Sequence, residues 1–134
     1  MTGLVLKLGP NERVLINGAV IENGNRRSRL NIMTPGANIL RLRDAIHPEQ
    51  TGTPVRRLCY IAQLVLSGDT DLDTARPQLL KGIDQVAQAL LDPVSQVALS
   101  DARRAAEDGQ AYYVLKSLRK LLPTEDVLLK GVSQ

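Results

Sequence analysis

The stretch TPVRRLCYIAQLVLSG (Thr53–Gly68) divides the sequence into two parts with different hydrophobic patterns. Its ends carry helix signals, because Thr53 is a favoured N-cap, Pro54 suits the first helical position and Gly68 is a common stop. Its apolar residues recur at helical spacing and cover more than the roughly 100° that a single contact needs. The stretch therefore predicts a helix that is central to a bundle or shared with a partner.

After Gly68 the helical pattern continues. Apolar spacing, together with the Pro and Gly residues, predicts three further helices and then one short turn in TEDVLLKGVSQ (Thr124–Gln134). The expected helices run from about Thr74 to Leu91, from Asp92-Pro93 to near Gly109, and over QAYYVLKSLRKLL (Gln110–Leu122), which is expected to end at Pro123. Residues 53–134 thus predict a helical part of about four helices.

Before Thr53 the pattern is that of short strands. Five runs rich in β-branched or aliphatic residues are separated by Gly, Pro and Asn. They are LVLKL (Leu4–Leu8), RVLIN (Arg13–Asn17), AVIEN (Ala19–Asn23), RRSRLNIM (Arg26–Met33) and ILRLR (Ile39–Arg43). Residues 1–52 therefore predict a small antiparallel β-sheet or barrel of about five strands, and the predicted fold class is α+β.

Two hairpins are expected in this β-rich part. Asn17-Gly18 is a strong signal for a type I′ turn, and pairing outward from it sets Arg13 opposite Glu22. A second hairpin, turning at Pro35-Gly36-Ala37, would put the apolar residues of the last two strands on one face. That register predicts Arg29 opposite Arg43 and Asn31 opposite Arg41.

Positive charge is concentrated in the N-terminal part. Residues 1–57 contain nine Lys or Arg against four Asp or Glu, whereas the remaining residues contain eight against ten. Like charges across a sheet are destabilising, so converging arginines indicate a phosphate-binding edge, for which the guanidinium fork is well suited. Two alternatives remain open, namely a solvated basic face and protection of a strand edge against aggregation.

The candidate nucleic-acid-binding residues follow from this charge pattern. They are Lys7, Arg26, Arg27, Arg29, Arg41 and Arg43 in the β-rich part, and Arg56 and Arg57 in the first turn of the Thr53 helix. The last two are expected to point toward the basic sheet edge. Cations are unfavourable at a helix N-terminus, so an anion from the nucleic acid or from a carboxylate such as Asp44 is expected to compensate them.

The sequence offers little for catalysis. His47 has no nucleophile in a recognised setting, and one His with one Cys cannot assemble a typical structural zinc site. DTDLDT (Asp69–Thr74) lacks the Gly and the Glu of a calcium loop and reads better as acidic capping of the next helix. We therefore expect no enzyme activity, no catalytic residue, no metal and no cofactor.

Other features indicate a cytoplasmic protein. The opening MTGLVLKLGP does not resemble a signal peptide, no run approaches the ~18 apolar residues of a membrane span, and no internal disulfide can form. We therefore expect no membrane partner. Three tyrosines, with no Trp and no Phe, argue against a stacking platform for unpaired bases.

Four segments resemble the flagellar-biosynthesis regulators of the FlbT family. They are GLVLKLGPNERVLINGAVIENG (Gly3–Gly24), RLRDAIHPE (Arg41–Glu49), TPVRRLCYIAQLVLSGD (Thr53–Asp69) and YYVLKSLRKLLP (Tyr112–Pro123). The resemblance implies post-transcriptional regulation, in which the protein associates with the 5′ untranslated leader of flagellin mRNA and promotes its decay.

A second resemblance covers only residues 3 to about 50. LVLKLGPNERVLINGAVI (Leu4–Ile21) and NILRLRDAI (Asn38–Ile46) are similar to carbon storage regulators of the CsrA type. That resemblance implies an intertwined dimer that binds leader RNA at its sheet edges, with Arg43 in the place of an arginine that contacts RNA. The first strand of those proteins is more basic, whereas Lys7 here is followed by Leu8, so Arg27, Arg29 and Arg41 would supply the missing charge.

Two functional hypotheses follow. The first is an RNA-binding translational regulator whose arginine face holds the flagellin mRNA leader. The second is a protein-interaction adaptor or chaperone-like module for flagellin or another flagellar regulator, with an indirect effect on RNA. For assembly, we expect either a homodimer built through the strands or a monomer whose helices cover one sheet face.

Overall fold

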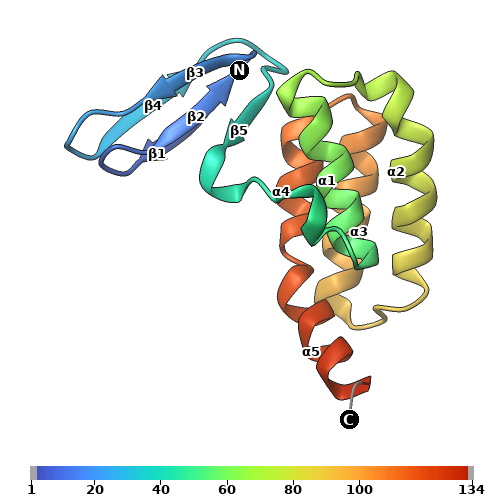
Figure 1. The fold of residues 1–134 in the computed structure, drawn as a ribbon. Coiled ribbons are helices and arrows are strands. Elements are labelled where there is room, and N and C mark those ends of the chain that lie inside the picture. Colours follow the sequence, from blue (N-terminus) through green and yellow to red (C-terminus); the bar gives the residue numbers. More distant parts are fainter. Residues whose placement is uncertain (1–2, 133–134) are drawn as a thin grey trace.

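A computed structural model describes residues 3–132. Strands occupy the N-terminal part and α-helices the remainder, as the α+β prediction requires (Figure 1). The strands are β1 (Leu4–Leu8), β2 (Arg13–Ile16), β3 (Ala19–Glu22), β4 (Ser28–Ile32) and β5 (Ile39–Arg41). Two 3-10 turns, η1 (Leu42–Asp44) and η2 (Pro48–Gln50), lead to helices α1 (Pro54–Ser67), α2 (Leu72–Ala87), α3 (Pro93–Glu107), α4 (Ala111–Arg119) and α5 (Leu122–Val132).

The first hairpin is confirmed. β2 pairs with β3 in the predicted register, with Arg13 opposite Glu22. Asn17 and Gly18 both have positive φ, 49° and 85°, as a type I′ turn demands. The Arg13 and Glu22 side chains form an exposed ion pair of 2.7 Å, which contributes little to stability.

The second hairpin prediction is wrong. β4 pairs with β1 and β5 pairs with β2, so the five strands form a two-stranded and a three-stranded antiparallel sheet. Asn17 explains part of this choice, because its N–H donates to the carbonyl of Asn38 and its side-chain oxygen accepts from the Asn38 N–H. Alternation of apolar residues specifies which face is buried but leaves the strand partner open.

The three-stranded sheet lies between two apolar cores. Val14 and Ile39 face the core shared with β1 and β4, whereas their neighbours Leu15 and Leu40 pack against the helices. Leu15 and Leu40 are directly opposite each other across β2 and β5. Because successive side chains of a strand point to opposite faces, this sheet contacts the β1–β4 sheet on one side and the helices on the other. We call residues 4–41 the β arm, which projects from the helices in Figure 1.

Helices α1 to α4 pack in sequence order around one core, and α4 returns to α1. The predicted caps are confirmed at Thr53 and Asp92, and Asp71 caps α2 by accepting from the Thr74 N–H. That cap starts α2 at Leu72, slightly before the predicted Thr74. The same helix ends at Ala87, where the Gln96 side chain donates to the carbonyls of Ala87 and Leu90.

Two predictions about the helices need correction. The fourth helix ends at Arg119 rather than at Pro123, which lies instead in the first turn of α5, where a proline loses no hydrogen bond. The expected short turn after it is an 11-residue helix. Ser133 and Gln134, the end of that predicted stretch, lie outside the described residues.

The helix expected at the centre, α1, is one of four helices around the core. Its wide apolar surface is explained by its neighbours, since α1 contacts α2, α4, α5 and β5. No helix within residues 3–132 combines the length and the apolarity that crossing a membrane requires.

The two-sided packing of β5 generates a stability prediction. Leu40 is 4% exposed, and replacing it with Ala should cost ~2–5 kcal/mol, the range for a buried Leu that leaves a cavity. Leu42→Ala is the matched control, because Leu42 is 36% exposed and should cost much less. Urea unfolding measures both free energies, and equal losses would contradict the docking of β5 on the helices.

Candidate nucleic-acid interface

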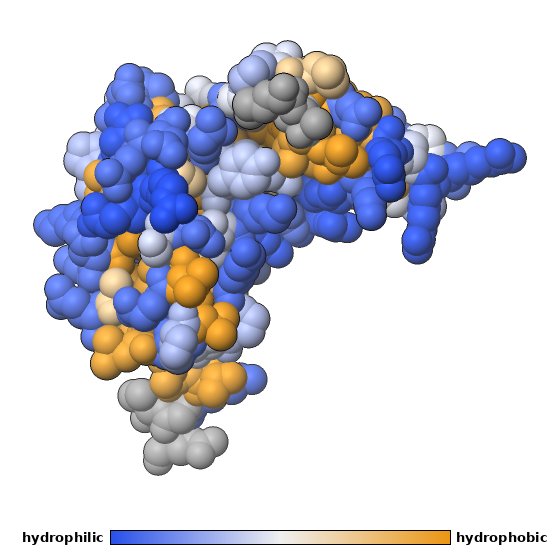
Figure 2. Space-filling view, turned by 180° about the vertical axis from the view of Figure 1, so that it is seen from behind, coloured by the Kyte–Doolittle hydropathy of each residue, from blue (hydrophilic) through white to orange (hydrophobic). Residues whose placement is uncertain are grey.

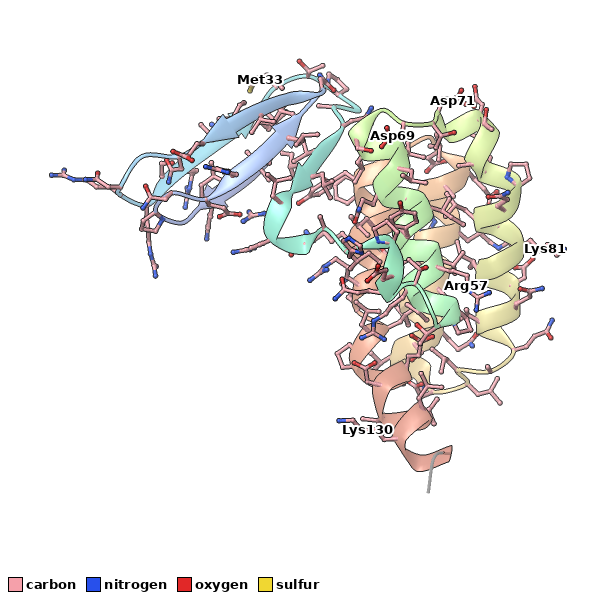
Figure 3. All side chains as sticks on the ribbon, in the orientation of Figure 1. Met33, Arg57, Asp69, Asp71, Lys81 and Lys130 are labelled. Carbon is pink, nitrogen blue, oxygen red and sulfur yellow. The ribbon has the colours of Figure 1, made fainter. Side chains whose placement is uncertain are left out.

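Four predicted RNA-binding residues meet in one surface hollow at the side of the β arm. Lys7 comes from β1, Arg27 from the segment before β4, Arg29 from β4 and Arg43 from η1. Leu8, Gly9, Pro10 and Ser28 complete the lining. We call Lys7, Arg27, Arg29 and Arg43 the basic groove. Nitrogen-tipped side chains extend from the end of the arm farthest from the helices in Figure 3, and Figure 2 shows this end as strongly hydrophilic.

The charges of this region are mostly not neutralised within the chain. Lys7, Arg26, Arg27 and Arg29 are exposed, and within residues 3–132 none of their charged groups has an ion pair. Lys7 lies directly opposite Arg29 across β1 and β4, an arrangement that destabilises a sheet. An anion bound between them would relieve that repulsion.

The predicted cross-strand pairs, Arg29 with Arg43 and Asn31 with Arg41, do not form. Arg29 faces Lys7, Asn31 faces Val5, and Arg41 faces Val14. Arg43 follows the last strand in η1 rather than ending it. The basic groove nevertheless brings Arg29 and Arg43 together, because both line it beside Lys7 of β1.

Arg41 differs from the other arginines of this region because it is paired with Glu12. Its carboxylate accepts from the Arg41 guanidinium at 2.9 Å and from the Gly9 N–H at 2.9 Å, and it lies 3.7 Å from Arg43. The side chain of Arg41 is 14% exposed, whereas that of Arg43 is 63% exposed. Burial disfavours the charged carboxylate, but the Gly9 N–H and the two arginines outweigh it and lower the pKa of Glu12. Arg41 is thus neutralised and Arg43 is only partly so.

Asn23 organises the end of the arm, a role that the sequence analysis missed. Its amide nitrogen donates to the carbonyls of Gly9 and Arg26 at 2.7 and 2.8 Å, and its oxygen accepts from the Ser28 hydroxyl at 2.7 Å. These bonds tie the β1–β2 turn to the segment that carries the arginines. The only signal in the sequence is an Asn before Gly24, which is typical of any turn.

Arg56 and Arg57 lie on the helices and not beside the strands. Arg56 donates two hydrogen bonds to Asp126 of α5, at 2.8 and 3.2 Å, so the compensating anion is Asp126 rather than Asp44. Arg57 is exposed near the start of α1, next to α2, and Figure 3 shows it well away from the arm. The expectation that both point toward the basic sheet edge is therefore wrong.

His47 and Cys59 serve the fold. His47 caps η2, since its Nδ1 accepts from the Glu49 N–H. Burial raises the pKa of the Cys59 thiol to about 12, which keeps it protonated and unreactive near neutral pH. Within residues 3–132 no cluster of three or more His, Cys, Asp or Glu could hold a metal ion.

These features define a small α+β protein with an exposed basic surface on an N-terminal β arm. The chain belongs to the FlbT family, because the family model described as flagellar protein FlbT matches residues 4–129.

Named relatives cover almost the same span. The chain is 30% identical over 128 residues to a probable flagellum biosynthesis repressor protein FlbT of Mesorhizobium japonicum, covering 96% of this chain and 86% of that protein. It is 29% identical over 133 residues to the flagellum biosynthesis repressor protein FlbT of Caulobacter vibrioides, covering 97% and 92%. A relative from Chelativorans is 29% identical over 129 residues, covering 96% and 88%. No solved structure shows significant similarity to the chain.

The environment of Glu12 generates a pH prediction. A carboxyl whose pKa is lowered on folding stabilises the protein above its ordinary value of 4.5, and this stabilisation is lost as the pH falls through the folded-state pKa. Glu12→Gln should therefore cost ~1–3 kcal/mol at pH 7 and progressively less below pH 4.5. The pKa values of Asp71 and Asp92 are also lowered. Both residues are present in the parent protein and in the variant, so their contributions cancel when the two free energies of unfolding are subtracted. Urea unfolding across this pH range measures the difference in the free energy of unfolding between the parent protein and Glu12→Gln. A difference that stays constant with pH would contradict the prediction.

Arg56 generates a second prediction. Arg56→Gln should lower the free energy of unfolding by ~1–2 kcal/mol, because it removes the bidentate pair with Asp126 and leaves Glu125, which is 8% exposed, without its nearby cation. RNA binding should be unchanged in the same variant. Arg57→Gln is the control for both measurements, since Arg57 is exposed and has no ion pair within residues 3–132. A loss of RNA affinity at unchanged stability would place Arg56 in the interface instead.

Proposed function

We propose that the protein is a post-transcriptional regulator that binds the 5′ untranslated leader of flagellin mRNA through its β arm and promotes decay of that mRNA. The observation that carries the proposal is the concentration of exposed, unneutralised cations at Lys7, Arg26, Arg27 and Arg29, with Arg43 beside them. Membership of the FlbT family supports a flagellar role, and the relatives named as repressors support regulation.

The chemistry of the basic groove favours a nucleic-acid backbone as the ligand. Three of its four cations are arginines, whose planar guanidinium binds phosphate oxygens in pairs. Lys7 and Arg29 are forced together by strand pairing, so a phosphate between them would contact two cations at once. Arg41 and Arg56 do not line the groove, and Glu12 and Asp126 already neutralise them. The protein acts as a binding protein, without a catalytic step of its own.

A second candidate function is an adaptor for flagellin or another flagellar regulatory protein. One observation favours it: Val94 and Val97, on one face of α3, are 77% and 62% exposed, and Leu91, just before that helix, is 73% exposed. Figure 2 shows apolar patches on the lower half of the helices. Exposed apolar groups in one patch are typical of protein interaction sites. In this function any effect on mRNA would be indirect.

Salt dependence separates the two functions. Filter binding of a flagellin leader RNA at several salt concentrations should show a steep loss of affinity with salt, because phosphate contacts release counterions. Binding that is weak, or that is insensitive to salt, would favour the adaptor. Light scattering of the free protein and of the complex would establish whether a homodimer forms.

Substitutions in the basic groove should weaken this binding. Arg27→Gln and Arg29→Gln should each reduce the slope of log affinity against log salt by about 0.7, the value for one contact to single-stranded RNA. Arg43→Ala should weaken binding more than Arg103→Ala, because Arg103 lies on α3 and pairs with Asp84. Arg13→Gln is the matched control within the arm, since its side chain is as exposed as that of Arg43 but is paired with Glu22. Equal affinities for all of these variants would reject the basic groove as the interface.

A further inference from the structure

A second hollow lies between the β arm and α4, with a volume of about 400 Å³. This is within the range of roughly 300–1,000 Å³ that small-molecule sites occupy. We call it the arm–bundle cleft. The residues that the following argument uses are Lys7 of β1, Arg43 and Asp44 of η1, and Tyr112, Lys116 and Arg119 of α4.

The arm–bundle cleft is continuous with the basic groove. Lys7 and Arg43 line both hollows, so a chain bound along the groove would pass between these two cations into the cleft. β1 and β5, which also line the cleft, each have a single strand partner among the described strands. An edge strand offers backbone N–H and C=O groups, which are suitable donors and acceptors for the edge of a base.

Cations from the helical side face those of the arm. Lys116 is exposed and, within residues 3–132, has no carboxylate partner; its ammonium group lies 6.0 Å from the centre of the Tyr113 ring. Arg119 is held at 3.2 Å by Asp44, the only acidic residue of the lining. Lys7 and Lys116 therefore leave positive charge on both walls of the cleft.

Tyr112 supplies an aromatic ring between these walls. It is half-buried and packs against both the core of the arm and the core of the helices, and its ring is nearly perpendicular to that of Tyr113, at 87° and 5.2 Å between ring centres. Burial raises the pKa of the Tyr112 phenol, so the ring stays uncharged near neutral pH. A ring fixed in this way can stack with a base without first being ordered. The scarcity of aromatic residues in the sequence had argued against such a platform.

We propose that the arm–bundle cleft binds one unpaired nucleotide of RNA, with its base against Tyr112 and its phosphates between Lys7 and Lys116. This inference rests on the proposed RNA-binding function and adds a site that selects single-stranded RNA. A base held in the cleft must leave its stack, so a duplex of the same sequence would lose this contact. Continuity with the arginines of the basic groove favours RNA over an acidic peptide as the occupant.

The first test compares two lysines near the end of α4. Lys116 lines the cleft, whereas Lys120 is also exposed but does not line it. With a single-stranded flagellin leader fragment, Lys116→Gln should reduce the salt slope by about 0.7 and Lys120→Gln should leave it unchanged. If both variants match the parent protein while Arg27→Gln and Arg29→Gln weaken binding, the cleft is not an RNA site and the proposed function stands. If the groove variants also match the parent, the proposed function fails as well.

The second test concerns the base. Tyr112→Leu should lower the affinity for single-stranded RNA about 5- to 100-fold and bring it close to that for the duplex, whereas Tyr113→Leu should have a smaller effect. Because Tyr112 also packs between the two cores, circular dichroism must show that the variant is folded.

Photocrosslinking of the parent protein needs no substitution at Tyr112. The same RNA with 5-iodouridine in place of uridine should crosslink to Tyr112, as located by mass spectrometry. Crosslinks confined to the arm would overturn the proposal.

Binding of an acidic flagellin peptide tests the alternative occupant of the cleft. A Lys116→Gln variant that loses binding to this peptide, and not to RNA, would also overturn the proposal and assign the cleft to a protein partner.

Discussion

The structure depends on the docking of β2 and β5 against the helices. The β arm has only four buried hydrophobic residues in its own core, Leu6, Leu8, Val14 and Ile39, and a unit of this size rarely folds without further support. The opposed pair Leu15 and Leu40 supplies that support, because both side chains pack against the helical core. Tyr112 contacts both cores and adds to the junction. The helices therefore act as the platform that holds the basic arm in place.

Charge neutralisation divides the cations of the chain into two groups. Glu12, Asp44 and Asp126 hold Arg41, Arg119 and Arg56, and these pairs join segments that are distant in the sequence. Lys7, Arg26, Arg27 and Arg29 have no such carboxylate within residues 3–132 and stand on the arm surface. The first group stabilises the fold, while the second costs stability through repulsion. The second group is suited to binding an anion, because a bound anion would offset that cost.

The fold class and most element boundaries could be predicted from local signals. Asn17-Gly18, Thr53-Pro54 and Asp92-Pro93 are short motifs whose backbone preferences do not depend on distant residues, and each lies where it was expected. The strand partners of β4 and β5, which are β1 and β2, could not be obtained in this way. Alternation of apolar and polar residues along a strand is equally compatible with several partners. Likewise, the sequence identified Arg41 and Arg56 as cations but could not reveal the carboxylates that neutralise them.

By itself, the sequence determined the α+β class, the helix caps, the first hairpin and the basic character of the N-terminal part, because these follow from residues close together in the chain. The tertiary structure alone decided which cations remain unneutralised, how Asn23 organises the end of the arm, and that Tyr112 and Lys116 of α4 face Lys7 of β1 across a cleft. These features join residues up to about a hundred positions apart. Their proximity arises from the packing of the arm on the helices, which no local pattern records.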